Sequence, residues 1–164
     1  MIILIDSREK ENSHILNYMA VNEISVKRKQ TLKFGDYSFI DHNTDYRNLI
    51  VIERKNSLDE LALNLTTGKK DNPINRRERF KNEFKRAKEA GAKIILLIEN
   101  ATQEDLLNHN YRSKLHTNAF VGSLNSWYNK GYIDNIFFCK DINNSGWAII
   151  KIFKQYLIDK IRST

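Results

Sequence analysis

The sequence contains very little cysteine, proline or glycine. A single cysteine, Cys139, among 164 residues excludes an intramolecular disulfide and a zinc site built from cysteines. With one proline and six glycines, the chain shows no low-complexity tract and no linker. Its length is that of one domain, so we expect a single domain over residues 1–164.

Long apolar runs are also missing. None approaches the roughly 20 residues that a membrane-spanning helix needs. The first ten residues, MIILIDSREK, lack the basic start of a signal peptide and are more typical of a first strand. We therefore expect an intracellular protein with no membrane partner.

Basic residues, by contrast, are in excess. Lysine and arginine number 27 against 20 acidic residues, which gives a formal net charge of +7. A balance of this sign favours a polyanionic partner, most often nucleic acid. Hydrophobic residues make up 41% of the chain, enough to form a core. The composition therefore indicates a globular domain with an affinity for polyanions.

Apolar periodicity and turn residues divide the chain into strands and helices. We expect strands at 1–5, 24–32, 36–40, 49–55, 93–99 and 135–139. We expect helices at 12–21, 58–65, 75–90, 117–130 and 145–162. The polar stretch 66–73, with Lys69 and Lys70, is expected as an exposed loop. This order predicts an α/β domain with a central mixed β-sheet flanked by helices, and ligand sites in such sheets lie where strands end.

The strand expected at 49–55 ends in three adjacent charges, Glu53, Arg54 and Lys55. Because side chains alternate between the faces of a strand, Glu53 and Lys55 share one face and Arg54 points to the other. A carboxylate can bind a hard divalent cation, and an ammonium can orient water or stabilise negative charge on phosphorus. The pair on one face therefore suits hydrolysis of a phosphodiester.

Asp36 is the candidate for a second carboxylate. It follows Gly35 at the start of a strand expected to pair antiparallel with 49–55. An antiparallel partner places its start near the other strand's end, so Asp36 and Glu53 can meet. The alternative is that Gly35 and Asp36 form an ordinary turn.

Two further acidic positions lie near these strand ends. The segment 6–9, DSRE, follows the first strand and adds acidic residues to the same edge. Asp59 follows Ser57, which with Glu60 forms a capping box at the start of a helix. Asp59 in the first helical turn also suits the helix dipole. A capping role and a catalytic role therefore both stay open for Asp59.

The motifs DSRE, GDY and VIERKNSLDEL, in that order, resemble the XPF-type structure-specific endonuclease family. That family carries an aspartate after glycine and then the pattern E-R-K-x-x-x-D. The matching residues here are Gly35 and Asp36, then Glu53, Arg54, Lys55 and Asp59. Arg79 occupies the family's arginine position on the next helix, and LLIE ends the following strand at Glu99. Glu83 stands where the family has glutamine, which is a departure. Beyond about residue 100 the resemblance rests only on the order of helices and strands.

The resemblance implies a restriction-endonuclease-like fold of the PD-(D/E)XK type. It also implies DNA cleavage that depends on Mg²⁺ or Mn²⁺, typically at junctions between duplex and single strands. The implied catalytic residues are Asp36, Glu53 and Lys55, and the implied metal ligands are Asp36, Glu53, Asp6 and Glu9. The arginines implied to hold phosphates or buttress the acids are Arg8, Arg54 and Arg79.

Many family members carry a tandem helix-hairpin-helix domain after the nuclease. This chain ends before such a domain could fit, so we expect a stand-alone nuclease domain similar to small bacterial or phage versions. Repair, recombination or phage DNA metabolism is the expected setting. A junction resolvase or exonuclease of the same fold, and a catalytically silent DNA-binding scaffold, are the alternatives.

Two helices bear on binding partners. In the helix expected at 75–90, Phe80, Phe84 and Ala87 fall at helical spacing, and the remaining surface is basic, with Arg76 and Arg77 among its cations. This surface predicts phosphate contacts without sequence readout, unless it is simply solvated. The last helix, 145–162, has a broad apolar face that indicates either a buried core helix or a homodimer interface. A protein partner in replication or recombination stays open.

Overall fold

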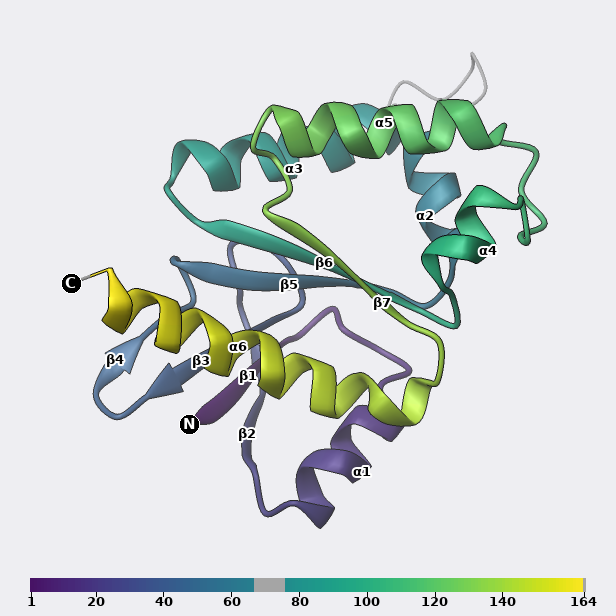
Figure 1. Cartoon of the computed structure of the whole chain (residues 1–164). Coiled ribbons are helices and arrows are strands. Elements are labelled where there is room, and N and C mark those ends of the chain that lie inside the picture. The colour runs from purple at the N-terminus through teal and green to yellow at the C-terminus, as the bar shows by residue number, and fades with distance from the viewer. Residues whose placement is uncertain (67–75, 164) are drawn as a thin grey trace.

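The computed structural model describes residues 1–66 and 76–163, which form one mixed β-sheet with helices on both faces (Figure 1). Its strands are β1 (Ile2–Asp6), β2 (Ser25–Gln30), β3 (Tyr37–Asp41), β4 (Thr44–Asp45), β5 (Ile50–Lys55), β6 (Lys93–Glu99) and β7 (Asn135–Cys139). Its helices are α1 (Ser13–Val21), α2 (Leu58–Leu65), α3 (Arg76–Glu89), α4 (Gln103–Leu107), α5 (Thr117–Asn129) and α6 (Ser145–Arg162). The loop lysines Lys69 and Lys70 lie outside the described residues.

The strand order brings several strand ends to one edge of the sheet. Across the described part of the chain the order is β2-β1-β3-β5-β6-β7, with β4 beside β3. β3 runs antiparallel to both β1 and β5, whereas β5, β6 and β7 are parallel to one another. The C-terminal ends of β1, β5 and β6 therefore lie together with the start of β3 along one end of the strands. This row of strand ends is called the sheet edge below, except where β2 is described as the outermost strand. This is the edge at which the sequence places its acidic motifs.

Each face of the sheet carries its own hydrophobic core. Helices α2, α3, α4 and α5 cover one face, and α1 and α6 cover the other (Figure 1). On the first face the rings of Phe84 and Trp127 lie with centroids 5.6 Å apart, in one cluster with Val51. On the second, Phe153 packs over Phe39, with ring centroids 4.7 Å apart. β5 is buried along its whole length between these cores, so the site at its end rests on a rigid element.

The predicted fold class, a mixed sheet flanked by helices, is confirmed. The strand expected at 24–32 ends earlier, at Gln30, because the next chain segment turns toward the loop after β1. The prediction missed three short elements, β4, α4 and the 3-10 turn Ile142–Asn144. α4 had a readable signal, since Thr102 and Asp105 form a capping box at its start.

The last helix, α6, is both a core helix and a partly exposed one. It buries Ile149 and Phe153 but leaves Trp147 and Ile161 exposed at 48% and 74%. The buried residues fit the predicted core helix, and the exposed apolar residues leave the predicted homodimer interface open. None of the helices among the described residues has the length and apolar character needed to cross a membrane.

Candidate active site

The end of β5 presents a buried ion pair. Lys55 Nζ lies 2.7 Å from Glu53 Oε1, and each residue is only 7% exposed. The ammonium also sits 4.7 Å from the centre of the Phe80 ring on α3, a cation–π contact. Strand alternation places both side chains on the face covered by α2 and α3. The Lys55 ammonium is therefore held between the Glu53 carboxylate and the Phe80 ring.

Asp36 approaches this pair from the start of β3. Its backbone N–H donates to the Ile52 carbonyl at 2.8 Å, and its Oδ2 accepts the backbone N–H of Arg54 at 2.8 Å. The turn depends on Gly35, whose φ is +63° and where a Cβ would lie 2.9 Å from Val51 Cβ. The segment is thus a tight turn, and that turn also holds the carboxylate at the sheet edge.

The charges at this edge perturb one another. Burial and the neighbouring carboxylates of Glu53 and Glu9 raise the pKa of Asp36 well above its usual value. Burial likewise raises the pKa of Glu53, although Lys55 opposes the shift and Glu83 adds to it. Burial alone would lower the pKa of Lys55, but Glu53 raises it above its usual value, so the ammonium is protonated. Two crowded carboxylates of this kind gain from a nearby cation.

The donor set at this edge fits a hard divalent cation that keeps part of its water shell. Among residues 1–66 and 76–163, no cluster of three or more His, Cys, Asp or Glu side chains is arranged to hold a metal ion by itself. Mg²⁺ is usually bound through one or two carboxylates, with waters and substrate phosphates completing its shell. Asp36 and Glu53 are a pair of this kind, and the pKa shifts of both carboxyls mark a place where positive charge is stabilising.

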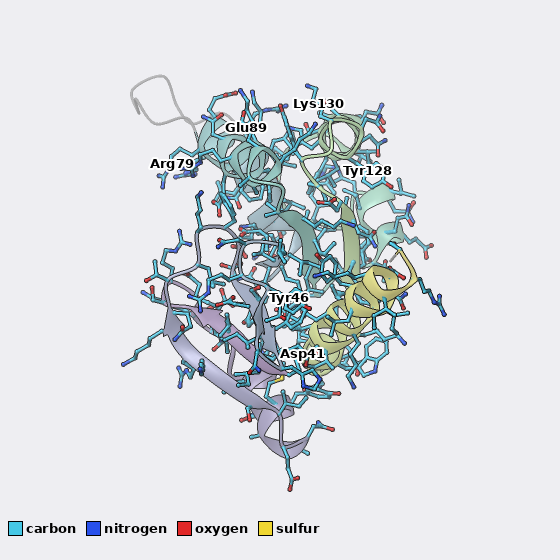
Figure 2. All side chains as sticks on the ribbon, turned by 90° about the vertical axis from the view of Figure 1, so that its left-hand side faces the viewer. Asp41, Tyr46, Arg79, Glu89, Tyr128 and Lys130 are labelled. Carbon is cyan, nitrogen blue, oxygen red and sulfur yellow. The ribbon has the colours of Figure 1, made fainter. Side chains whose placement is uncertain are left out.

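A basic cleft of about 640 Å³ opens above the pair. Glu53 and Lys55 lie in its wall, and the arginines around it are Arg8, Arg76, Arg79 and Arg86. Figure 2 shows Arg79 projecting outward from α3. The side-chain oxygen of Asn64, also in the wall, is buried and has no hydrogen-bond partner among the described residues. Neither Asn64 nor Arg86 was identified from the sequence. They come to line the same cleft only because α2 and α3 pack against each other.

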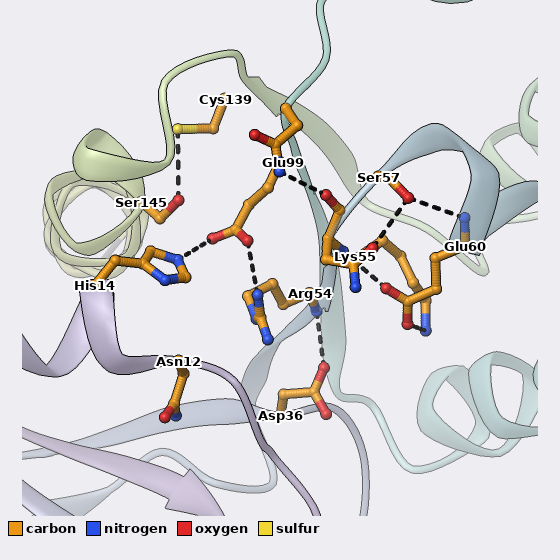
Figure 3. A network of polar contacts seen from close by, with 12 residues as sticks. Asn12, His14, Asp36, Arg54, Lys55, Ser57, Glu60, Glu99, Cys139 and Ser145 are labelled. Carbon is orange, nitrogen blue, oxygen red and sulfur yellow. Dashed lines mark hydrogen bonds and ion pairs between the residues drawn. The ribbon is translucent and has the colours of Figure 1, made fainter. Parts of the chain in front are cut away.

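Arg54 lies on the opposite face of β5, where its guanidinium donates hydrogen bonds to other groups of the protein (Figure 3). Its Nε donates to Glu9 Oε1 and its Nη1 to Glu99 Oε2, both at 2.6 Å. Its Nη2 donates to the Lys10 carbonyl at 2.9 Å. His14 Nε2 completes the network, 2.8 Å from Glu99 Oε1. This arrangement favours the buttressing role for Arg54 over a phosphate contact, and His14 is a member that the sequence did not reveal.

Asp6 is engaged inside its own loop. Its Oδ1 accepts bonds from the backbone N–H and the Nε of Arg8, at 2.9 and 2.7 Å. Its Oδ2 accepts the N–H of Leu32 at 2.8 Å. Burial tends to raise the pKa of Asp6, but these hydrogen bonds outweigh it and lower the pKa. They favour a structural role for Asp6 over the metal-binding role that the resemblance implies. Glu9, the other implied ligand, is held by Arg54 and by the Tyr37 hydroxyl at 2.9 Å.

Asp59 lies in the first turn of α2, as expected, where its carboxylate binds the loop before α5, and its catalytic role stays a prediction. Ser57 caps α2 by accepting the Glu60 N–H at 3.1 Å, but the Glu60 side chain accepts the Asn56 N–H at 2.8 Å, so only half of the expected capping box forms. Asp59 Oδ1 accepts the backbone N–H groups of Arg112 and Ser113, at 2.8 and 2.7 Å. Asp59 therefore ties the loop before α5 to the first turn of α2.

Two α3 residues, Arg77 and Glu83, make contacts with other parts of the protein. Arg77 donates from Nη1 to the Leu65 carbonyl at 3.2 Å and does not line the cleft, unlike Arg76. Glu83, the departure from the family pattern, lies in the cleft wall, where its Oε1 accepts the Gly35 N–H at 3.2 Å. Glu83 thus connects α3 to the turn that holds Asp36.

The comparisons with known proteins agree with this geometry. Residues 5–146 match the ERCC4 domain, a family of nucleases that act on DNA structures in repair. A search of curated proteins gives no match. The matched span covers most of the chain and contains every strand-end motif described above. The chain therefore belongs to the ERCC4 domain family and is an XPF-type nuclease domain with a restriction-endonuclease-like fold.

Proposed function

We propose that the protein is a DNA endonuclease that requires Mg²⁺ or Mn²⁺ and cuts branched DNA or junctions between duplex and single strands. The observation that carries this proposal is the buried Glu53–Lys55 pair beside Asp36, at the base of an arginine-lined cleft. Membership of a nuclease family supports DNA as the substrate. The setting is DNA repair or recombination, or the DNA metabolism of a phage.

Each group has a role that its position supports. The cleft arginines, Arg8 and Arg79 among them, hold the phosphates that flank the cut. Asp36 and Glu53 hold the cation, which supplies Lewis-acid chemistry for phosphodiester hydrolysis when bound. The Lys55 ammonium, fixed by Glu53 and Phe80, donates hydrogen bonds to the attacking water or to the phosphoryl oxygen that gains charge. The water oxygen bonds to phosphorus as the bond to the leaving sugar oxygen breaks, with the water losing a proton to solvent and the leaving oxygen taking one from solvent.

A substrate panel tests this proposal. The wild-type protein is incubated with end-labelled flap, fork, Holliday-junction and linear DNAs, each with Mg²⁺, Mn²⁺ or EDTA. Metal-dependent internal cuts near a junction support the proposal. Cuts confined to four-way junctions, or stepwise loss from ends, would assign a junction resolvase or an exonuclease instead. Binding without cutting of any substrate would assign a silent scaffold.

We also propose that the protein forms a homodimer through α6. The support is the exposed apolar part of this helix, at Trp147, Ile158 and Ile161. A groove of about 330 Å³ beside α6 has apolar wall residues, Phe137 and Tyr156 among them, together with charged ones, and could receive such side chains. Light scattering at micromolar concentration should give twice the chain mass, and Ile161→Asp should reduce it. A monomer mass for the wild type contradicts the dimer.

A further inference from the structure

β2 forms one edge of the sheet and carries an unusual run of charge. Its central residues, Lys27, Arg28 and Lys29, are all exposed. None of the three forms an ion pair with another residue of the described chain, whereas Arg8, Arg54 and Lys55 near Glu53 each do. Side chains of successive strand residues point to opposite faces, so the three cations make this edge strand, here called the strip, strongly positive on both sides.

A β-bulge shapes the strip. Leu4 of β1 is paired with Lys27 and Asp6 with Gln30, so three steps along β2 match two along β1. Lys29 has a φ of +56°, a conformation that residues other than glycine rarely adopt. Bulges of this kind occur at sheet edges and beside active sites, where they redirect side chains.

The end of β2 is hydrogen-bonded to a loop that borders the cleft. There the Gln30 carbonyl accepts the Ser7 N–H at 2.7 Å, and two residues on, the Leu32 N–H donates to Asp6 Oδ2. Both contacts fix the loop that carries Arg8, and Arg8 lines the cleft opposite the arginines of α3. In Figure 2, Arg79 projects from α3 at the upper left, and the violet N-terminal strands lie below it on the same side. A polyanion along β2 would therefore reach Arg8 and then Glu53.

We propose that Lys27, Arg28 and Lys29 bind the phosphate backbone of a DNA arm that leaves the cleft along β2, an inference that rests on the proposed nuclease function. Three strand residues span roughly 7–10 Å. DNA has a phosphate about every 3.4 Å of axis per strand, so two or three phosphates match this length. Backbone contacts of this kind add affinity and direction without reading sequence. The rival explanation is that the charges only protect an edge strand from pairing with other chains.

The test is DNA binding measured by fluorescence anisotropy in EDTA, where no cutting occurs, with a labelled forked DNA over a salt series. The test variant is Lys27→Gln/Arg28→Gln/Lys29→Gln. The control, Lys114→Gln/Lys130→Gln/Lys140→Gln, removes the same charge from exposed positions outside β2, the cleft and α6. Lys27→Arg/Arg28→Lys/Lys29→Arg keeps the charge of the strip.

The test variant should bind at least tenfold more weakly at low salt than the control, with a salt slope smaller by about 1–3. The charge-conserving variant should bind as the wild type does. If the folded test variant matches the control, the proposal is wrong and the charges serve edge protection. Should the test variant aggregate, photo-crosslinking of the wild type to DNA decides: crosslinks within residues 27–33 support the proposal, and their absence overturns it. Failure of the wild type itself to bind DNA would contradict the nuclease function as well.

Discussion

Lys55 Nζ lies 2.7 Å from Glu53 Oε1, and both side chains are withdrawn almost completely from solvent. A buried ion pair is seldom a source of net stability, because removing two charges from water costs about as much as their attraction returns. Its presence at the base of a basic cleft is therefore better explained by chemistry than by stability.

Asp36 should make the metal-free protein less stable at neutral pH. Its folded-state pKa is raised above the value of about 3.9 expected for an unfolded chain. Between these two values the folded protein binds more protons, so stability falls as pH rises through that window. Asp36→Asn should therefore have a higher Tm than the wild type in EDTA at neutral pH, with the difference vanishing toward pH of about 4. Thermal unfolding at pH values across this range measures the Tm difference, and Asp45→Asn at an exposed position is the control. An equal or lower Tm for Asp36→Asn at every pH would refute the prediction.

Arg54 should be a structural residue. Arg54→Ala leaves Glu9 and Glu99 without their main cationic partner, and breaking a buried pair costs about 3–5 kcal/mol. Urea unfolding in the presence of EDTA measures the loss. Arg47→Ala, which breaks an exposed pair with Asp45, should cost no more than about 1 kcal/mol. A stable Arg54→Ala protein that has lost DNA binding would show that Arg54 contacts phosphate instead.

Asp59 should hold the loop before α5 in place. Asp59→Ala removes the acceptor of the Arg112 and Ser113 N–H groups, at a cost of about 1 kcal/mol. Trypsin should then cut faster after Arg112 and Lys114, a change followed by mass spectrometry. Asp59→Asn keeps an oxygen acceptor and should resist cutting as the wild type does. If Asp59→Ala leaves proteolysis unchanged but abolishes Mn²⁺ binding, Asp59 is a metal ligand.

Much of this site could be predicted from the sequence, because strand alternation alone separates Glu53 and Lys55 from Arg54. Antiparallel pairing of neighbouring strands, which is also a local feature, places Asp36 near Glu53. The hydrogen-bond partners of the Asp6 and Asp59 carboxylates could not be predicted, because Leu32 and Arg112 lie 26 and 53 positions away in the sequence. Such contacts depend on how loops pack, and no periodicity in the sequence encodes that packing.

Glu83 should tune the cation site through its charge and fix Asp36 through its hydrogen bond. Glu83→Gln keeps an acceptor for the Gly35 N–H but removes a charge that acts on Glu53. Its affinity for Mn²⁺ should be roughly 2- to 10-fold weaker, the effect of one charge a few ångströms away in a solvated cleft. Glu83→Ala also frees the turn, so its Tm should fall below that of Glu83→Gln. Calorimetric titration with Mn²⁺ measures the affinities, and an unchanged affinity for both variants would contradict the assigned role.

The most direct test of the proposed function compares cleavage by the wild type, Glu53→Gln and Lys55→Ala under single-turnover conditions. The DNA is the best substrate of the panel, and Lys130→Ala, an exposed position outside α3 and the cleft, is the control. The wild type should cut only with Mg²⁺ or Mn²⁺, and both active-site variants should cut roughly 10²- to 10³-fold more slowly or not at all while still binding DNA. Cutting by Glu53→Gln at the wild-type rate, or wild-type cutting that persists in EDTA, would contradict a metal-dependent site centred on Glu53 and Lys55.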